Sequence, residues 1–485
     1  MIERAQVPFA RWLNTIETEI EQGNRLVKHD LMQGTINSMG IGDIGPVLYA
    51  SDGSELRHKR VIETVLHTIH GNVALRRLGY SLRSHQNIFP LDAAINLPSS
   101  SFSFELQRFI ARRISTSPLE EVLDLVREIN GAKIGRRQAM EIVQSSAVDF
   151  DDFYGKLQDP NSINAPIMVL TTDGKGIIMR PDGLREGTRK RAEAAQKKMK
   201  KRLAKGEKSN RKRMAQVTSI YLTLRFPRTP KDIIEELARE KSKKERPKPV
   251  DKRVWASVEK EPKVVIRAMF DEAHRRDPKH KKDWVVLVDG HKQQMRLVKS
   301  LVKREGVSAV IILDIIHVIE YLWVAARVFY PKEEETSKEC QRWVDDKLEM
   351  ILNSEAGKVA GSIRMSAAKA KLTKVQEKTA EKCAGYIARR KQYMDYLRYL
   401  KLGYPIATGI IEGACRYLIK DRMDVTGARW SLNGAESVLK LRALVKNGDF
   451  DEYWPHHVQR EYERNHATRL LDVGQLQPLF AKRPS

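Results

Sequence analysis

Two short apolar runs near the middle of the chain each end in an aspartate and lead into a stretch with helical spacing. They are "DWVVLVDG", residues 283–290, and "SAVIILD", residues 308–314. Apolar runs of this length are typical of buried strands, and strands that alternate with helices indicate parallel crossover units. The chain therefore predicts an α/β sheet in which Asp289 and Asp314 stand at the carboxyl ends of two strands.

The flanking segments extend this sheet. Residues 165–179, "APIMVLTTDGKGIIM", predict two strands, and residues 217–226, "VTSIYLTLRF", predict a third. Helical spacing is found at 262–276, at 291–304 and from residue 316. Three strands followed by helix, strand, helix, strand and helix is the order of a ribonuclease-H-like fold, in which parallel crossovers extend an antiparallel sheet. We expect such a catalytic core, a mixed sheet flanked by helices, over residues 160–329.

The rest of the chain divides into further regions. A mixed α/β region over residues 1–155 starts with helical spacing and continues with β-hairpins; at 117–147 it carries two amphipathic helices that resemble a helix-turn-helix. Residues 330–402 are rich in Lys and Glu and have no strand pattern, which predicts an all-α insertion. We expect residues 403–457 to complete the catalytic core and residues 458–485 to form a tail.

The charge balance favours a nucleic-acid partner. Lys and Arg number 87 against 62 Asp and Glu, which gives a net charge of +25. Such an excess neutralises phosphates, although it also keeps an ordinary basic protein dispersed. A basic arm at 185–214 and two arginines of the helix-turn-helix, Arg136 and Arg137, are the expected DNA-binding segments. The alternatives are a solvated basic surface and a helical hairpin without a DNA role.

Cysteine usage and hydropathy predict a cytoplasmic protein. Cys340, Cys383 and Cys415 lie far apart without paired spacing, so we expect neither a disulfide framework nor a zinc site. The N-terminus has no apolar run of signal-peptide type. The most apolar stretch, residues 307–330, contains acids and an arginine that are costly to insert into a bilayer, so we expect no membrane span.

Carboxylates at strand ends are candidates for chemistry, because open sheets gather their ligands there. The candidates are Asp173, Asp289, Asp314 and, at the start of a later helix, Glu412. Simpler alternatives are a hairpin turn for Asp173, a helix cap for Asp289 and an exposed helical acid for Glu412. The turn can instead lie at residues 181–183, where "PDG" is an equally good turn sequence. Carboxylates suit Mg²⁺ or Mn²⁺, and phosphodiester cleavage uses two such ions about 3.5–4 Å apart. We therefore expect a site for two divalent ions.

Six blocks of sequence occur in a recognisable order between residues 45 and 457. They are "TTDGKGI", "VVLVDGHKQQ", "LDIIHVIEYLW", "ATGIIEGACRYLIKDR", "TGARWSLNGAESVLKLRA" and "NGDFDEYW". Together they resemble the signatures of bacterial insertion-sequence transposases of the ISKra type, relatives of the Mutator-like DDE transposases. The resemblance implies a DDE nuclease and strand-transfer domain interrupted by an α-helical insertion before the glutamate.

Carried over by motif, the resemblance makes Asp173 the first catalytic, metal-binding acid and Glu412 the last. Relatives in the wider group place a D-x-x-H or C-x-x-H signature after the second aspartate, and "DIIH", Asp314 to His317, matches it. Asp289 is then the second acid, in agreement with its place on the fourth strand of the fold. Asp314 and His317 would orient ligands or hold the neighbouring helix. Some relatives carry cysteine-rich zinc elements, and this chain has none.

The expected function is that of a DNA transposase. It would bind the terminal inverted repeats of its element, hydrolyse a strand with Mg²⁺ and join the freed 3'-hydroxyl to target DNA, as at least a dimer. Expected DNA contacts are Lys175, Arg136, Arg137, Arg189, Lys190, Arg191, Arg416, Arg422, Arg429 and Trp430, the last of which has a core position as its alternative. Two alternative functions are a nuclease or resolvase of the same fold and a non-catalytic DNA-binding repressor derived from a transposase.

Overall fold

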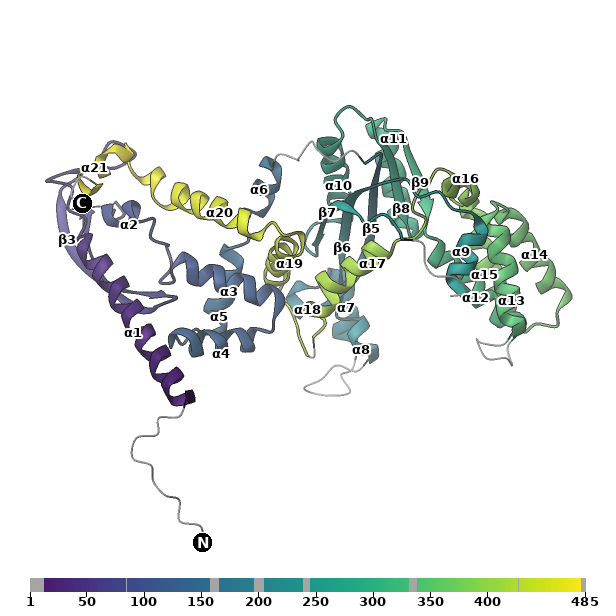
Figure 1. Cartoon of the computed structure of the whole chain (residues 1–485), viewed down its shortest axis with the longest axis horizontal. Coiled ribbons are helices and arrows are strands. Elements are labelled where there is room, and N and C mark those ends of the chain that lie inside the picture. The colour runs from purple at the N-terminus through teal and green to yellow at the C-terminus, as the bar shows by residue number, and fades with distance from the viewer. Residues whose placement is uncertain are drawn as a thin grey trace, which may run out of the picture. The chain divides into compact units, whose positions relative to one another are not determined.

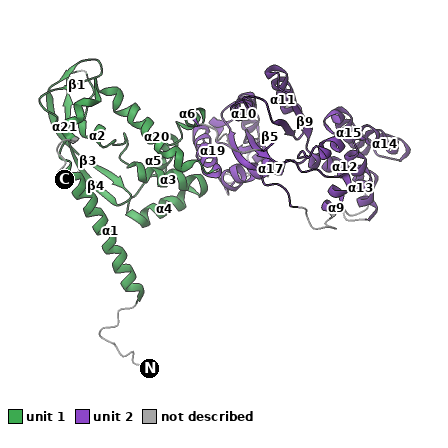
Figure 2. Ribbon diagram, turned by 45° about the horizontal axis from the view of Figure 1, so that its top comes forward, with its two compact units in different colours: residues 1–156, 448–485 green, residues 157–447 purple. Residues whose placement is uncertain are grey.

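A computed structural model describes residues 13–83, 85–157, 165–195, 205–238, 245–330, 338–425 and 427–480. The chain is a mixed α/β protein that divides into two compact units, residues 1–156 with 448–485 and residues 157–447 (Figure 2). Residues 196–204 of the predicted basic arm and residues 481–485 of the predicted tail lie outside the described residues. Within the described ranges, no helix combines the length and the apolar character that a bilayer-spanning segment needs.

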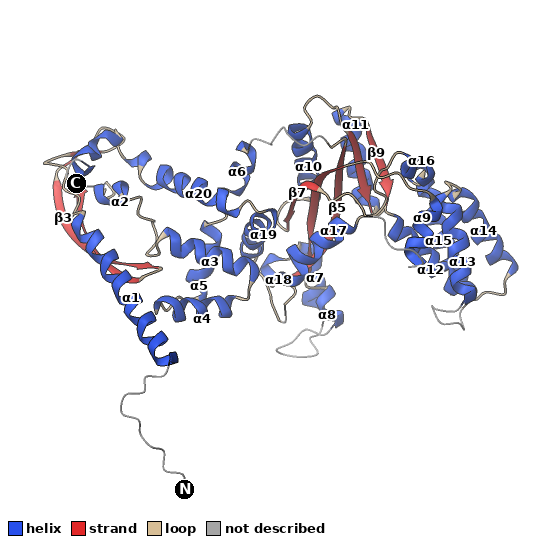
Figure 3. Cartoon of the chain, in the orientation of Figure 1, coloured by secondary structure: helices blue, strands red, loops and turns tan. Residues whose placement is uncertain are grey.

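The unit of residues 157–447 is built on a five-stranded mixed sheet (Figure 3). Its strands are β5 (Ile167–Ile178), β6 (Lys212–Thr223), β7 (Val250–Ser257), β8 (Asp283–Val288) and β9 (Ala309–Leu313). In space they are ordered β7-β6-β5-β8-β9. The first three pair antiparallel, whereas β8 and β9 extend the sheet in parallel on the other side of β5. The predicted α/β class is confirmed.

The antiparallel strands differ from those expected from the sequence. The pattern predicts two strands in residues 165–179, but β5 runs through them without a turn, because Asp173 pairs with Val217 in the middle of β6. The chain turns later, at the 3₁₀-helix η1 (Pro181–Gly183). β7 is absent from the expected scheme, since its first residues, "VDKR", resemble a charged connector. Pairing with β6 outweighs that local composition.

Helices cover both faces of the sheet (Figure 1). The crossover helices are α10 (Pro262–Arg276), α11 (Lys292–Glu305) and α12 (Ile315–Phe329). On one face α10 and α11 pack against strand residues such as Leu170 and Val286. On the other face α12 packs against Val169 and Leu287. Strand side chains alternate between the faces, so a residue's position in its strand decides which helices it meets.

A layer of helices packs on α12 (Figure 1). It comprises α13 (Lys338–Leu352), α14 (Ala356–Lys369), α15 (Lys374–Arg390), the 3₁₀-helix η2 (Lys391–Tyr393) and α16 (Tyr396–Lys401). Their apolar side chains share one core with α12 and its sheet face. The unit also contains α7 (Glu186–Ala194), α8 (Lys205–Ser209), α9 (Pro230–Ala238), α17 (Gly409–Ala414), the π-helix η3 (Cys415–Lys420), α18 (Asp421–Met423) and α19 (Leu432–Asn447).

A buried carboxylate ties α10 to β7. Glu272 is 2% exposed and pairs with Arg253 of β7 and with Arg275 and Arg276 of its own helix. Burial alone would raise the pKa of Glu272, but the three arginines outweigh it, so the pKa lies below its ordinary value. Because cations fully surround this acid, it is a structural link and not a candidate for chemistry.

The other unit combines β-hairpins with helices from both ends of the chain. Its elements are α1 (Leu13–Ser38), β1 (Leu48–Tyr49), β2 (Glu55–Leu56), β3 (His58–Thr68), β4 (Gly71–Ser81), α2 (Pro90–Ala94), α3 (Phe104–Thr116), α4 (Leu119–Asn130), α5 (Arg136–Ser145), α6 (Phe150–Lys156), α20 (Phe450–Asn465), η4 (Ala467–Arg469), η5 (Val473–Leu476) and α21 (Gln477–Phe480). β1 pairs with β2 and β3 with β4, both antiparallel. The Gln33 amide of α1 bonds the backbone of Ala74 in both directions, which holds this helix on β4.

Candidate functional site

Three aspartates lie at the same level on neighbouring strands. The register aligns Thr171 of β5, Leu287 of β8 and Ile312 of β9. Two residues further along stand Asp173, Asp289 and Asp314, and the Asp314 N–H continues the ladder by donating to the last carbonyl of β8 at 2.8 Å. Residues two apart share a face, so these aspartates belong to the α12 face at the carboxyl end of the parallel strands. Neighbouring strands are about 4.8 Å apart, so the three aspartates stand on adjacent strands at one level of the sheet.

The helix that carries Glu412 approaches β5 through Cys415. The Cys415 thiol donates to Asp173 Oδ2 at 3.3 Å, and Asp173 Oδ1 accepts the Gly174 N–H at 2.6 Å. Cys415 opens the π-helix η3 directly after α17, three residues beyond Glu412. Side chains three apart lie on the same side of a helix, so Glu412 also belongs to the side near β5.

The pKa of Glu412 reflects the acids around it. Partial burial raises this pKa, and the charges of Asp314, Glu320 and Asp173 raise it further, while His317 acts in the opposite direction. Like charges that share a site disfavour ionisation unless a cation offsets them. The acids from β5, β9 and α12 thus make the neighbourhood of Glu412 attractive to a positive ion.

Asp314 is fully buried and caps α12. Its Oδ1 accepts the Ile316 N–H at 2.9 Å, and its Oδ2 accepts the hydroxyl hydrogen of Thr408. Burial raises the pKa of Asp314, although these two hydrogen bonds favour the ionised form. Thr408 is the residue directly before α17. The Asp314 carboxylate therefore joins the start of α12 to the start of the helix that carries Glu412.

His317 completes a compact group of possible metal ligands. One ligand atom each from Asp314, His317 and Glu412 lie within 4.8 Å of one another. His317 Nδ1 is 3.1 Å from Glu320 Oε2. Burial lowers the pKa of His317, but the carboxylates of Glu320, Asp314 and Asp289 outweigh burial, so the pKa is raised. This donor set can hold a divalent cation, because carboxylate oxygens and an imidazole nitrogen are both good ligands.

Asp289 lies in a turn that α15 holds in place. Its Oδ1 accepts at 2.7 Å the N–H of His291, the residue directly before α11. Its carbonyl accepts the Tyr386 hydroxyl hydrogen at 2.9 Å, and the next carbonyl, of Gly290, accepts from Arg390 Nε at 3.0 Å. Gly290 has φ +83°, and a Cβ there would meet the Tyr386 oxygen at 2.7 Å. Only glycine suits both this backbone and this close approach.

The predicted acids therefore gather at one end of the sheet. The tightest group of ligand atoms, however, is not the predicted catalytic set. Asp173, Asp289 and Asp314 come from adjacent strands, and Glu412 is brought to them by α17. The tight group pairs Glu412 with Asp314 and His317, which the sequence had assigned to a supporting motif. The contacts of Thr408, Cys415, Tyr386 and Arg390 were not anticipated, since each joins segments far apart in the chain.

A second compact group lies in the unit that contains both termini. Ligand atoms of Asp149, His457 and Glu461 are also within 4.8 Å of one another. However, Arg464 donates to Asp149 Oδ1 at 2.6 Å and pairs with Glu461, and His457 Nδ1 lies 2.7 Å from Asp149 Oδ2. An arginine already neutralises these acids, so the group is a buried ion-pair network that fastens α20.

The residues expected to contact DNA divide into exposed and buried sets. Those exposed are Lys175 on β5, Arg189, Lys190 and Arg191 on α7, Arg416 on η3, and Arg429. Arg422 and Trp430 are only 4% and 8% exposed, and the Arg422 guanidinium lies over the indole ring at 4.9 Å. Trp430 Nε1 donates to the Met423 carbonyl at 3.0 Å. In this conformation both side chains are core residues, the alternative given for Trp430.

Arg136 and Arg137 open α5, the second helix of the predicted helix-turn-helix. Both are exposed, and each pairs with a glutamate: Arg136 with Glu120 at 2.7 Å and Arg137 with Glu141 at 2.8 Å. Exposed ion pairs contribute little stability, so either guanidinium can exchange its glutamate for a phosphate. A DNA role for these arginines stays a prediction.

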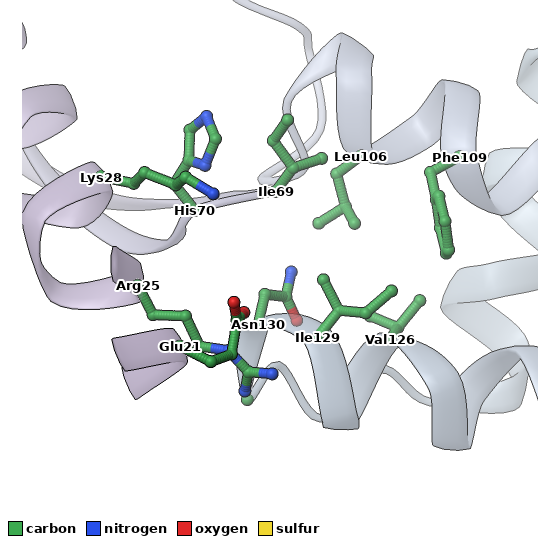
Figure 4. A pocket seen from close by; sticks show the side chains of 11 residues that line it. Glu21, Arg25, Lys28, Ile69, His70, Leu106, Phe109, Val126, Ile129 and Asn130 are labelled. Atoms are coloured by element: carbon green, nitrogen blue, oxygen red, sulfur yellow. The ribbon is translucent and has the colours of Figure 1, made fainter. Parts of the chain in front are cut away.

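A cavity of about 540 Å³ lies among α1, α3 and α4 (Figure 4). On one side the apolar side chains of Leu106 and Phe109 face those of Val126 and Ile129. On the other side Arg25 bonds Glu21 at 3.1 Å and the Glu128 carbonyl at 2.8 Å. Because the lining mixes apolar, acidic and already paired basic groups, it specifies no ligand class.

No model of a known protein family matches the chain, and a search among curated proteins returns no significant match. The resemblance to transposases described from the six sequence blocks therefore stays a prediction.

Proposed function

We propose that this chain is a metal-dependent DNA transposase whose centre is the acid cluster formed by Asp173 within β5, by the aspartates at the ends of β8 and β9, and by Glu412. Two parallel strands added to three antiparallel ones, in the order β7-β6-β5-β8-β9, support a ribonuclease-H-like core. The single observation that carries the proposal is the convergence of acids from three strands and from α17 at one end of this sheet. A net charge of +25 suits a polyanionic substrate.

We assign Asp173, Asp289 and Glu412 as the residues that would hold Mg²⁺ or Mn²⁺, as the family resemblance implies. Asp289 is partly exposed, and its Oδ2 accepts no hydrogen bond from the described residues. Asp314 is 0% exposed and has both oxygens engaged, so it suits a positioning role better. A bound pair of divalent ions would stabilise the charge on the attacking and leaving oxygens of a phosphodiester.

The surrounding residues hold these acids in place. Asp314 links α12 to Thr408 and so fixes where α17 begins, which sets the position of Glu412. At the other end of α17, Cys415 donates to the Asp173 carboxylate and so holds this helix against β5. Tyr386 and Arg390 hold the turn that carries Asp289. Preorganisation of this kind keeps ligand groups in a productive arrangement before the substrate arrives.

The proposed reaction has two steps on DNA, a hydrolysis that leaves a 5'-phosphate on the flanking strand and then a transesterification. Water attacks a phosphorus at the element end and leaves a 3'-hydroxyl. That hydroxyl then attacks a target phosphorus and expels the 3'-oxygen of the target strand. No covalent bond between enzyme and DNA is required. Lys175, exposed and two residues beyond Asp173 on β5, is available to contact the phosphate.

The test uses the purified full chain and a plasmid that carries the genomic DNA on both sides of its coding sequence. With Mg²⁺ or Mn²⁺ we expect strand cleavage at the element ends, followed by joining of a precut 3' end to a second plasmid. Asp173→Asn, Asp289→Asn and Glu412→Gln should each lose both activities while keeping DNA binding. Wild-type cleavage by any of the three removes that residue from the assignment.

The same experiment separates the alternatives. A nuclease or resolvase would cleave without joining the precut end. A repressor derived from a transposase would bind DNA and show no metal-dependent cleavage.

A further inference from the structure

A second charged feature lies directly beside the acid cluster. A cavity of about 540 Å³ opens between α11 and the end of α15. Its charged lining consists of Lys292, Arg296 and Lys299 on α11 and Arg389 and Arg390 on α15. The remaining lining residues are Met295, Gln392 and Tyr393, so no acid faces the cavity. None of these five cations was among the DNA contacts expected from the sequence.

The helical spacing explains why the cations converge. Lys292, Arg296 and Lys299 follow one another by four and three residues, which places them on one face of α11. Lys299 Nζ lies 5.8 Å from the centre of the Tyr393 ring, which bridges the helix to η2. Arg390 is half-buried, and its guanidinium carbon lies 4.1 Å from the centre of the Tyr386 ring, which holds this side chain in place beside the cavity.

Among the described residues, none of the five cations forms an ion pair with a carboxylate. Arg390 donates instead to the carbonyls of Gly290 and Tyr386, and the charge of Arg389 acts on Glu381 without forming an ion pair. On α7, by contrast, Arg189 and Lys190 pair with glutamates four residues away. Like charges three or four residues apart destabilise a helix, so this face of α11 carries a repulsion that no carboxylate among the described residues offsets through an ion pair. An anion from outside the chain would remove it.

The cavity is connected to the acid cluster through one turn. Asp289 Oδ1 accepts the N–H of His291, and the next residue, Lys292, is the first of α11. Arg390, which lines the cavity, bonds the carbonyl of Gly290, the residue next to Asp289. The turn after β8 therefore links the lining of the cavity to Asp289.

We propose that this cavity is a binding site for the sugar-phosphate backbone of DNA and that it delivers the backbone to the acid cluster. Lysine and arginine bind phosphate oxygens without reading bases, and arginine can do so with two parallel hydrogen bonds. The choice of DNA as the polyanion rests on the proposed function. The positive cavity itself does not depend on that choice.

The experiment compares two double variants of the full chain. Lys292→Ala with Lys299→Ala removes two cavity charges, while Lys263→Ala with Lys303→Ala removes two exposed lysines outside the cavity, on α10 and α11. Binding to a fluorescent duplex of arbitrary sequence is measured by anisotropy over a salt series. Each lost phosphate contact lowers the slope of log K against log salt by about 0.9 for duplex DNA. We expect a reduction of about 2 for the cavity pair and none for the control pair.

Equal slopes for the two double variants would overturn the proposal, because the cavity charges would then act no differently from any surface lysine. Displacement of the duplex from the wild type by an RNA hairpin at much lower concentration would overturn DNA as the ligand. Thermal melting checks that both variants are folded.

Failure of the proposed function has a different signature. One outcome is that the Lys292→Ala, Lys299→Ala variant shows the reduced salt slope but the wild type never cleaves DNA with Mg²⁺ or Mn²⁺. The proposed phosphate-binding site is then supported, and the transposase proposal is refuted. The other outcome is that the wild type cleaves DNA and the Lys292→Ala, Lys299→Ala variant binds and cleaves equally well. The transposase proposal is then supported, and the phosphate-binding site is refuted.

Discussion

Asp289 is proposed as a metal ligand and Asp314 as a positioning residue, and substitutions at the two positions distinguish this assignment from the opposite one. Asp314 Oδ1 caps α12, and its Oδ2 accepts from Thr408 in a fully buried position. Asp314→Ala removes the cap, at about 0.5–2 kcal/mol, and leaves a buried hydroxyl unpaired, at about 1–3 kcal/mol. The sum is about 1.5–5 kcal/mol of folding stability. Asp314→Asn keeps the capping oxygen and offers Thr408 a donor, so we expect a loss of less than about 1 kcal/mol.

For cleavage the order of the two positions should be reversed: a change at Asp289 should slow the reaction more than a change at Asp314. Asp289→Asn removes the charge of a proposed metal ligand, and a loss of about 3–4 kcal/mol in transition-state stabilisation corresponds to a 10²–10³-fold slower reaction. Residues that only support ligands typically cost about 10–100-fold when changed, which is the range expected for Asp314→Asn. Asp289→Asn should leave the melting temperature unchanged, because the amide oxygen can still accept the His291 N–H.

The assay combines metal-dependent nicking of a supercoiled plasmid with thermal melting of the same preparations. A change of about 1 kcal/mol in the free energy of unfolding shifts the melting temperature by about 2–4 °C in a domain of this size. The reasoning is refuted if Asp314→Asn cleaves no better than Asp173→Asn while Asp289→Asn cleaves like the wild type. Asp314 would then replace Asp289 as the second ligand acid, in keeping with its place beside Glu412 and His317 in the compact group of the structure.

Three further predictions concern stability and metal binding. Glu272→Gln should destabilise the fold by about 3–5 kcal/mol in chemical denaturation, because it leaves buried Arg253 and Arg276 without their shared carboxylate. Since the pKa of Glu272 is lowered by folding, its contribution is present above the unfolded pKa and is lost as the pH falls through the folded pKa; the wild type should lose stability on acidification more steeply than Glu272→Gln. Gly290→Ala should cost at least about 1–2 kcal/mol from its positive φ and also reduce cleavage, since the turn carries Asp289; a variant with normal melting and cleavage contradicts the close packing against Tyr386. Mn²⁺ at about 100 times its Kd should stabilise the wild type by about 2.7 kcal/mol, and Asp173→Asn should abolish that gain; an equal shift in both proteins would place the ion elsewhere.

Much of the core was predictable because its determinants are local. Strand β8, strand β9 and the helices after them follow from apolar runs and helical spacing, and each aspartate falls where its run ends. The same local signals misled where pairing decides the outcome. "TTDGKGI" has the composition of a turn, yet β5 continues through it, because β6 satisfies its backbone hydrogen bonds over the whole length.

By itself, then, the sequence determined the α/β class, the succession of the crossover units and the strand-end positions of Asp289 and Asp314, since periodicity and residue type act over a few neighbouring residues. Only the tertiary structure decided that Asp314 reaches Thr408, that Cys415 reaches Asp173, that Arg422 and Trp430 are buried and that five cations surround one cavity. These contacts join segments many residues apart. Their existence depends on how helices and strands pack, which no local pattern records.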